Sequence, residues 1–453
     1  MIWQNKKELY FFHQLSSFQI IFLGFLAVIL AGSLLLTLPA ASAGGEQTPF
    51  LDALFTATSA VCVTGLVVHD TATYWSLFGQ IVILILIQIG GMGVVTMAIF
   101  LAKVSGRKIG LMQRSTMQEA IAAPQVGGIV RLTEFILKVT LAAEIIGAAL
   151  LAMVFTKEFG LERGIWYGIF HSVSAFCNAG FDLMGVKSPY SSLTSCQSQP
   201  AVNLVIMGLI VMGGIGFLTW DDVRKNGLCW KQYRMQSKVI FSVTGLLILL
   251  PAVYFFCFEF SRPVWEEMTV SDRMLRSFFQ SVTPRTAGFN TVDLTLFSEA
   301  GQVIMILLML IGGSPGSTAG GMKTTTAAVL WFSALAVFRR QEDAGCFGRR
   351  IAGETIRSAA AILLMYLVLL CTGSILISRL EELPVLACFF EAASAIGTVG
   401  LTLGLTPSLG GVSRMILILL MFFGRVGGMT LIFAAISGSR RLAKYPQEKI
   451  TVG

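Results

Sequence analysis

The sequence is poor in charged residues and in the groupings that build catalytic or metal sites. Only 13% of its 453 residues are Asp, Glu, Lys or Arg, against about 25% in soluble domains, while 55% are hydrophobic. The histidines, His13, His69 and His171, lie far apart, and the eight cysteines lack the paired spacing of metal ligands. We therefore expect no enzyme, no structural or catalytic metal and no covalent cofactor.

Other absent motifs restrict the class of protein further. No cleaved secretory signal is recognisable, and no Gly-x-Gly-x-x-Gly motif follows a strand pattern. Many apolar runs instead reach the roughly 20 residues that a transmembrane helix needs. The sequence thus predicts a polytopic membrane protein with no nucleic-acid partner. Most cysteines are expected to be small buried residues, with Cys196 as the one odd thiol in a short external loop.

One eight-residue pattern, SAVCVTGL at residues 59–66, organises the chain because it occurs three more times. It returns as SAFCNAGF, VTPRTAGF and SAIGTVGL. Each copy follows a short apolar segment and precedes paired glycines in a hydrophobic run. The copies align on Gly65, Gly180, Gly288 and Gly400. A fourfold repeat of a long unit determines the architecture.

Each unit is predicted to hold a span, a short helix that enters the membrane part-way, a glycine turn and a second span. The fold class is therefore an all-α polytopic membrane protein. Its four parallel repeats supply eight transmembrane helices and four re-entrant pore loops around a pseudo-fourfold central pore. The predicted segments are a cytoplasmic N-terminus 1–16, repeats at 17–103, 129–222, 236–340 and 355–438, and a cytoplasmic C-terminus 439–453.

The distribution of charge agrees with this topology. The presumed inner segments hold 21 of the 33 basic residues but 9 of the 25 acidic ones. Cytoplasmic loops carry such an excess of Lys and Arg, so both termini are expected inside. If the short helices crossed fully, alternate loops would change sides and the bias would disappear. The inner segments are 1–16, 103–134, 221–238, 339–357 and 438–453.

The glycine turns indicate a function for the fourfold repeat. Unpaired backbone groups inside a membrane cost several kcal/mol each unless they face protein or a water-filled cavity. Four such turns around one axis would direct carbonyl oxygens at a centre, where they can replace the hydration shell of an alkali cation. The alternative is close helix packing through small residues. For Gly90, Gly213 and Gly427 in the second spans we favour packing or a kink.

The third unit is interrupted by IGGSPGSTAGGMKTTT, residues 311–326. Its glycines and proline exclude a continuous helix, which predicts a mid-membrane loop beneath the pore loops, positioned as a gate. Lys323 and Arg425 are expected to face the cavity, where their charge would oppose cation passage. The alternatives are that Lys323 reaches the inner surface and that Arg425 bonds to a helix-end carbonyl. Met322 separates glycine from lysine, which excludes a phosphate-binding loop.

Together these motifs resemble the Trk/Ktr/HKT superfamily of K⁺ transporters, which includes bacterial Trk and Ktr membrane subunits and plant and fungal relatives. The resemblance covers about residues 17–437 and is closest to the Ktr type, because the chain starts directly with the first unit. It implies K⁺ uptake across the bacterial cytoplasmic membrane by a homodimer. It also implies a cytosolic ring of nucleotide-binding regulatory subunits, with no nucleotide on this chain. Whether uptake depends on Na⁺ is left open.

The resemblance also implies roles for individual residues. A glycine rather than a serine at Gly65 implies a preference for K⁺. The filter carbonyls would come from Val63, Thr64, Gly65, Asn178, Ala179, Gly180, Thr286, Ala287, Gly288, Thr398, Val399 and Gly400. The gate would comprise Gly312, Gly313, Ser314, Pro315, Gly316, Ser317, Thr318, Ala319, Gly320, Gly321, Lys323 and Arg425. The partner would be recruited by Arg224, Lys225, Arg339, Arg340, Arg349 and Arg350, unless these serve orientation alone.

The third filter copy differs from the others because it carries Arg285. We interpret this arginine as packing behind the filter, since a charge on the axis would repel the ion; Asn290 and Asp293 could contribute to the mouth. Two other functions stay open. One is a pore that prefers Na⁺ or is non-selective. The other is a solute carrier or a non-transporting subunit of an ion pump, for which inverted repeats would be typical.

Overall fold

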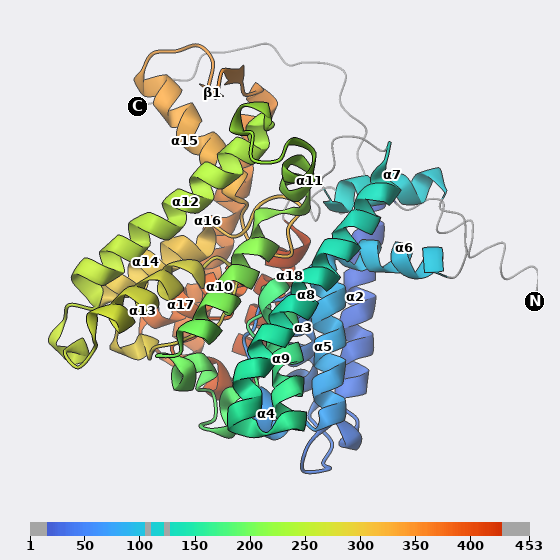
Figure 1. Ribbon diagram of the computed structural model, residues 1–453, viewed down its shortest axis with the longest axis vertical. Coiled ribbons are helices and arrows are strands. Elements are labelled where there is room, and N and C mark those ends of the chain that lie inside the picture. The colour runs from blue at the N-terminus through green and yellow to red at the C-terminus, as the bar shows by residue number, and fades with distance from the viewer. Residues whose placement is uncertain (1–15, 105–109, 122–126, 428–453) are drawn as a thin grey trace, which may run out of the picture.

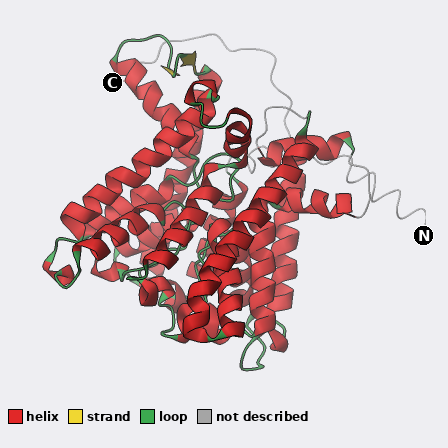
Figure 2. Ribbon diagram, viewed as in Figure 1, coloured by secondary structure: helices red, strands yellow, loops and turns green. Residues whose placement is uncertain are grey.

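The computed structural model describes residues 16–104, 110–121 and 127–427. In these residues the protein is almost entirely helical, and the strands form one short antiparallel hairpin, β1 Gly345–Cys346 with β2 Arg349–Arg350 (Figure 2). Of the predicted cytoplasmic segments 1–16 and 439–453, all but residue 16 lies outside the described residues. Short 3₁₀ helices, labelled η, occupy several connections; they are η1 Pro39–Ala41, η2 Met184–Val186, η3 Ser192–Cys196, η4 Trp230–Gln232, η6 Pro263–Trp265, η7 Leu294–Leu296 and η8 Thr406–Ser408.

Four described helices are long and apolar enough to cross a membrane. They are α2 Ser17–Leu36, α8 Ile129–Phe159, α12 Met235–Tyr254 with its π-helical extension η5 Phe255–Glu259, and α16 Gly353–Glu381. Each coincides with the first span predicted for a unit. At most 33% of each apolar window is buried. The exposed remainder is apolar, as lipid contact requires.

A shorter helix follows each of these four. The four are α3 Phe50–Val61, α9 Leu161–Phe176, α13 Val270–Val282 and α17 Val385–Gly397. They contain 12 to 16 residues, which span about 18–24 Å and fall short of a hydrocarbon core of about 30 Å. Their aromatic residues Phe55, Phe170, Phe279 and Phe390 are completely buried. The short helices are thus enclosed by the longer ones.

The second helix of each unit is α5 Leu77–Met92, α10 Pro200–Ile215, α14 Glu299–Leu310 or α18 Gly411–Val426. In the first two units the second span is broken at a glycine. Gly93 and Gly216 adopt φ of 85° and 96°, a conformation that cannot continue a right-handed helix. After the break the chain resumes as α6 Val94–Val104 and α11 Phe217–Asn226, the latter bent by 92° from α10. Gly427 ends α18 with the same geometry.

The remaining elements define the two ends of the molecule (Figure 1). At one end lie α6, α7 Leu111–Ile121, α11, the β1–β2 hairpin and the end of α15 Thr324–Phe338. At the opposite end lies the single-turn helix α4 Thr71–Tyr74. The short helices α3, α9, α13 and α17 run between these ends, so the turns that follow them lie inside the bundle.

Candidate functional site

The four glycine loops share one backbone conformation. Two residues before each glycine, a non-glycine residue adopts a left-handed φ of 50° to 67°, and the glycine itself has φ of 70° to 92°. Three of the four non-glycine residues are β-branched, for which this region is strongly disfavoured. The pairs are Val63 and Gly65, Asn178 and Gly180, Thr286 and Gly288, and Thr398 and Gly400. Strain repeated at equivalent positions marks a functional constraint.

The loops close into a ring in chain order. A Cβ atom built on any of the four glycines would approach the middle carbonyl oxygen of the next loop more closely than the 3.0 Å that real Cβ contacts keep. The pairs, glycine first, are Gly65 with Ala179, Gly180 with Ala287, Gly288 with Val399, and Gly400 with Thr64. Because the fourth loop contacts the first, the structure brings all predicted filter residues together around one axis.

The backbone amides of the loops donate hydrogen bonds to the short helices that precede them. The carbonyl oxygens of the loops therefore point away from those helices. The amides of Thr64, Ala179 and Val399 donate to serine carbonyls at 2.8 Å, and the amide of Gly65 donates to Ser59 Oγ at 3.0 Å. Within the described residues, no hydrogen bond reaches the carbonyl oxygen of any predicted filter residue. Except for the half-buried Gly65 these residues are buried, and buried backbone carbonyls are rarely left without a partner. The ring therefore presents orphaned carbonyl oxygens.

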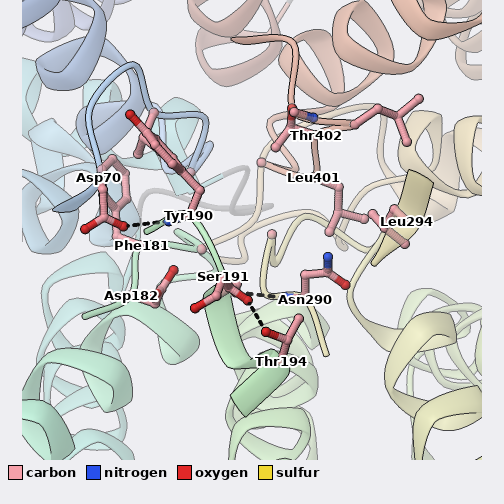
Figure 3. A pocket seen from close by; sticks show the side chains of 18 of the residues that line it. Asp70, Phe181, Asp182, Tyr190, Ser191, Thr194, Asn290, Leu294, Leu401 and Thr402 are labelled. Carbon is pink, nitrogen blue, oxygen red and sulfur yellow. Dashed lines mark hydrogen bonds between the residues drawn. The ribbon is translucent and has the colours of Figure 1, made fainter. Parts of the chain in front are cut away.

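A cavity of about 530 Å³ opens onto the ring, and the four glycines are among the residues that line it. Figure 3 shows other side chains around this cavity. Asn290 and Asp293 line its wall, as predicted for the mouth. Sequence reasoning missed Asp70 and Asp182, which also line it. The Met184 amide donates to Asp182 Oδ1 at 2.9 Å, while burial, together with the nearby Asp70, raises the pKa of Asp182 to about 7. The sequence held a signal for Asp182. Among the four residues that lie two positions after the repeated glycines, it is the only acidic one.

The connection between α9 and α10 crosses the mouth of this cavity. At one side the Tyr190 amide donates to Asp70 Oδ1 at 3.0 Å (Figure 3). At the other side the Leu193 amide donates to Asn290 O at 2.9 Å. Cys196 is the last residue of η3 in this connection and is fully buried, and burial raises its pKa. It thus lies in the expected loop, but it is not an exception to the buried cysteines.

Residues 311–323 form the predicted interruption between α14 and α15. The loop lies directly beneath the ring: Gly320 contacts the Thr398 side chain, and Gly312 contacts Thr286 Cγ2. Thr318 Oγ1 donates to Phe176 O, the last carbonyl of α9, at 2.9 Å. The loop is thus attached to the ring through α9.

Lys323 and Arg425 both bond to backbone carbonyls, and whether they face the cavity stays a prediction. Lys323 Nζ donates to Ala319 O at 2.8 Å within its own loop. Arg425 donates to Thr318 O and to Gly90 O, and also to Gly91 O at 3.2 Å. Its predicted alternative, a helix-end carbonyl, is confirmed, because Gly90 and Gly91 belong to the last turn of α5. Broken helices leave such carbonyls in need of donors.

The paired glycines have two separate structural roles. Gly90 and Gly213 pack against the last carbonyls of α3 and α9, so closely that a Cβ would collide with them. The packing prediction is confirmed for these two. In the fourth unit the packing role falls to Gly424, which contacts Ile396 O. Gly427 instead ends its helix, in the conformation that Gly93 and Gly216 adopt.

Several other residues that the sequence analysis singled out have local partners. Arg285 is 3% exposed and donates to Thr244 Oγ1 at 3.2 Å, behind the third loop as expected. Arg224 pairs with Asp221 at 2.7 Å, and Arg350 with Asp343 at 3.0 Å. His171 is buried between the Tyr167 carbonyl and the Leu183 amide.

The fold and the ring define a helical membrane protein with four repeated loops around one axis. The sequence profile of the TrkH family, described as cation transport proteins, matches residues 1–445. The chain therefore belongs to this family, which is a family of transporters rather than enzymes.

Two relatives and one solved structure illustrate the match. The "Potassium/sodium uptake protein NtpJ" of Enterococcus hirae is 41% identical over 97% of this chain and 98% of its own length. The "Ktr system potassium uptake protein B" of Bacillus subtilis is 38% identical over 96% of each chain. The crystal structure of the potassium transporter TrkH from Vibrio parahaemolyticus covers 93% of this chain and 84% of its own, with a TM-score of 0.72 at 19% identity. This last likeness shows the fold alone.

Proposed function

We propose that this protein takes up K⁺ across the bacterial cytoplasmic membrane through the ring of four glycine loops. The observation that carries the proposal is the set of buried carbonyl oxygens without hydrogen bonds, arranged where four loops meet. The filter comprises Val63–Gly65, Asn178–Gly180, Thr286–Gly288 and Thr398–Gly400. Carbonyls in such a ring replace the water ligands of an alkali cation. The family and the printed names of the two relatives agree with a potassium substrate.

The topology belongs to the same proposal. Four first spans and four broken second spans make eight crossings, and α3, α9, α13 and α17 are re-entrant. The end of the molecule that holds α11 and the β1–β2 hairpin is rich in basic residues. In this proposal it faces the cytoplasm, together with both termini. Asp70, Asp182 and Asp293 then lie at the outer mouth, where negative charge concentrates cations.

The gate in this proposal is the loop 312–321 with Lys323 and Arg425. The loop lies beneath the ring, so an ion that leaves the filter inward meets it first. Arg425 holds it through Thr318, and Thr318 holds α9 through Phe176. Conduction requires this loop to move. The charged groups would act chiefly as tethers, since they bond to carbonyls.

The proposed assembly is a homodimer with a cytosolic ring of nucleotide-binding subunits that controls the gate. "Ktr system" in the name of the Bacillus subtilis relative agrees with a membrane subunit that works with other components. Arg339, Arg340 and Arg349 are exposed at the proposed inner end and suit an acidic partner surface. Nucleotide would bind to the partner, and Na⁺ would act as a coupling ion if uptake depends on it.

The test is uptake of ⁸⁶Rb⁺ and ²²Na⁺ into proteoliposomes with the chain alone and with its regulatory partner. We expect Rb⁺ uptake that excess K⁺ suppresses and that the partner modulates. Absence of Rb⁺ uptake in both preparations, from correctly folded protein, would contradict the proposal.

Conduction of Na⁺ is the second candidate, because the Enterococcus hirae relative is named a potassium/sodium uptake protein. The first filter position separates the two, since a serine there goes with Na⁺ in this superfamily. Gly65→Ser should raise Na⁺ relative to Rb⁺ uptake if the native filter prefers K⁺. A native protein that takes up both ions equally would favour the second candidate.

A further inference from the structure

A polar cluster lies buried in the membrane behind the second filter loop. It joins Glu144 of α8, Gln88 of α5 and Cys177 of the loop itself. Gln88 Nε2 donates to Glu144 Oε2 at 3.4 Å, and Cys177 Sγ lies 3.9 Å from Glu144 Oε1 and 3.8 Å from Gln88 Oε1. Glu144 is 6% exposed, and no ion pair to it occurs in the described part of the chain. An ionisable side chain at such a position is costly in a membrane and marks function.

Packing of the repeat does not require this cluster. In three units a glycine of the first span contacts a leucine of the second, which aligns the units: Gly32 with Leu86, Gly147 with Leu209, and Gly373 with Leu420. Three residues before these glycines stand Ile29, Glu144 and Leu370, and all are buried. The positions equivalent to Gln88 hold Val211 and Phe422. Glu144 of the second unit and Gln88 of the first are therefore the only polar residues among these equivalent positions, and the others carry apolar side chains.

Cys177 connects the cluster to the filter. It precedes Asn178, the strained residue of the second loop, and is fully buried. On its other side Gly91 approaches so closely that a Cβ would come within 2.6 Å of the sulfur. The third loop is held in the same way, since Arg285 occupies the position of Cys177 and bonds to Thr244 of its own first span. A polar contact with the first span is thus a recurrent means of fixing a loop from behind.

We propose that Glu144, together with Gln88, is a positioning residue that sets K⁺ over Na⁺ selectivity through Cys177. The two hydrogen-bonding side chains hold the sulfur against Gly91, and the sulfur holds the backbone of Asn178–Gly180. Without them the loop relaxes, and its carbonyls adapt to the smaller ion. This inference rests on the proposed filter function.

The test replaces the cluster with the residues that other units carry. Glu144→Ile copies Ile29, and Gln88→Val copies Val211, so each replacement introduces a side chain that an equivalent position of another unit already carries. Replacing both partners together avoids leaving either one unpaired. We expect the Rb⁺ to Na⁺ uptake ratio in proteoliposomes to fall about fivefold or more, the effect of one lost hydrogen bond. The fall should come from increased Na⁺ uptake.

Three further variants make the outcome decisive. Glu144→Gln retains a hydrogen-bonding side chain of the same size and should keep most of the ratio. Cys177→Ala removes only the link between the cluster and the loop, and it should lower the uptake ratio as the double variant does. If the double variant does not fold, Cys177→Ala still tests the proposal. Leu370→Met is the matched control, because it changes the side chain at the equivalent buried, apolar position of the fourth unit.

The outcomes separate the two proposals. If the native protein takes up no Rb⁺, the filter function itself fails. If the native protein is selective and both Cys177→Ala and the double variant stay equally selective, the positioning role is wrong. A loss of selectivity in Glu144→Gln as large as in the double variant would also overturn it, because charge rather than hydrogen bonding would then be responsible.

Discussion

Gly400 of the fourth loop lies against the carbonyl oxygen of Thr64 in the first loop, and this contact closes the ring. Neighbouring loops could contact one another in an open row, but only a closed ring brings the last loop to the first. Both residues are buried, and the glycine has a φ of 92°. The contact therefore constrains the site in two ways, through the backbone angle and through the absence of a Cβ.

The first prediction concerns this contact. Gly400→Ala should reduce Rb⁺ uptake about tenfold or more, because the methyl group collides with Thr64 O and the backbone strain costs about 1–3 kcal/mol. Gly45→Ala is the matched control, since Gly45 also has a positive φ, of 71°, but no atom near its Cβ position. Equal uptake by the two variants would contradict the ring as the conducting site.

The second prediction concerns the loop beneath the ring. Shortening residues 313–321 should raise K⁺ flux through the chain without its regulatory partner, because the loop blocks the inner side of the ring. Flux into liposomes is the measurement, with circular dichroism to verify the helical fold. Unchanged flux in a folded variant would remove the assignment of this loop as the gate.

The third prediction concerns the tether of that loop. Arg425→Gln removes the guanidinium that bonds to Thr318, Gly90 and Gly91, and charged hydrogen bonds contribute about 1.5–3 kcal/mol each. We expect partner-independent flux to rise severalfold and thermal stability to fall. Arg339→Gln is the control, because that arginine is exposed and lies outside the loop contacts. A fall in flux with Arg425→Gln would show that the arginine supports the open pore instead.

The fourth prediction concerns charge at the mouth. Above pH 7, where Asp182 with its raised pKa of about 7 is ionised, Asp182→Asn should weaken the apparent affinity for Rb⁺ about fivefold at low ionic strength. The reason is that one charge near the ion contributes about 1 kcal/mol in water. Added choline chloride should reduce the difference by screening. Glu162→Gln serves as the control, as Glu162 is exposed near the start of α9 and does not line the cavity. An affinity unaffected by Asp182→Asn would exclude this electrostatic role.

The fifth prediction concerns thiol reactivity. Cys229 is exposed between α11 and α12, whereas Cys196 is buried and its pKa is raised, so less of it is the reactive thiolate at neutral pH. A membrane-impermeant maleimide should label Cys229 from the cytoplasmic side and leave Cys196 unlabelled. A Gly45→Cys variant provides the positive control for the outer face. Labelling of Cys229 from outside would reverse the proposed topology.

The sequence by itself determined the features that depend on local backbone and composition. The apolar runs specified a membrane protein, and the repeated motif marked Gly65, Gly180, Gly288 and Gly400, which do adopt positive φ. The glycines and proline of 311–323 excluded a helix there. Each of these follows from a few adjacent residues, so a repeated pattern is sufficient to find it.

The tertiary structure alone decided which distant groups meet. Arg425 bonds to carbonyls of the first and third units, Cys196 is covered by a folded connection, and Glu144 reaches Gln88 and Cys177 from a different helix. The same holds for the glycines of the second spans, because packing and helix-breaking glycines look alike in sequence. Contact between remote segments depends on how whole helices pack against one another. A pattern of a few adjacent residues does not determine that packing.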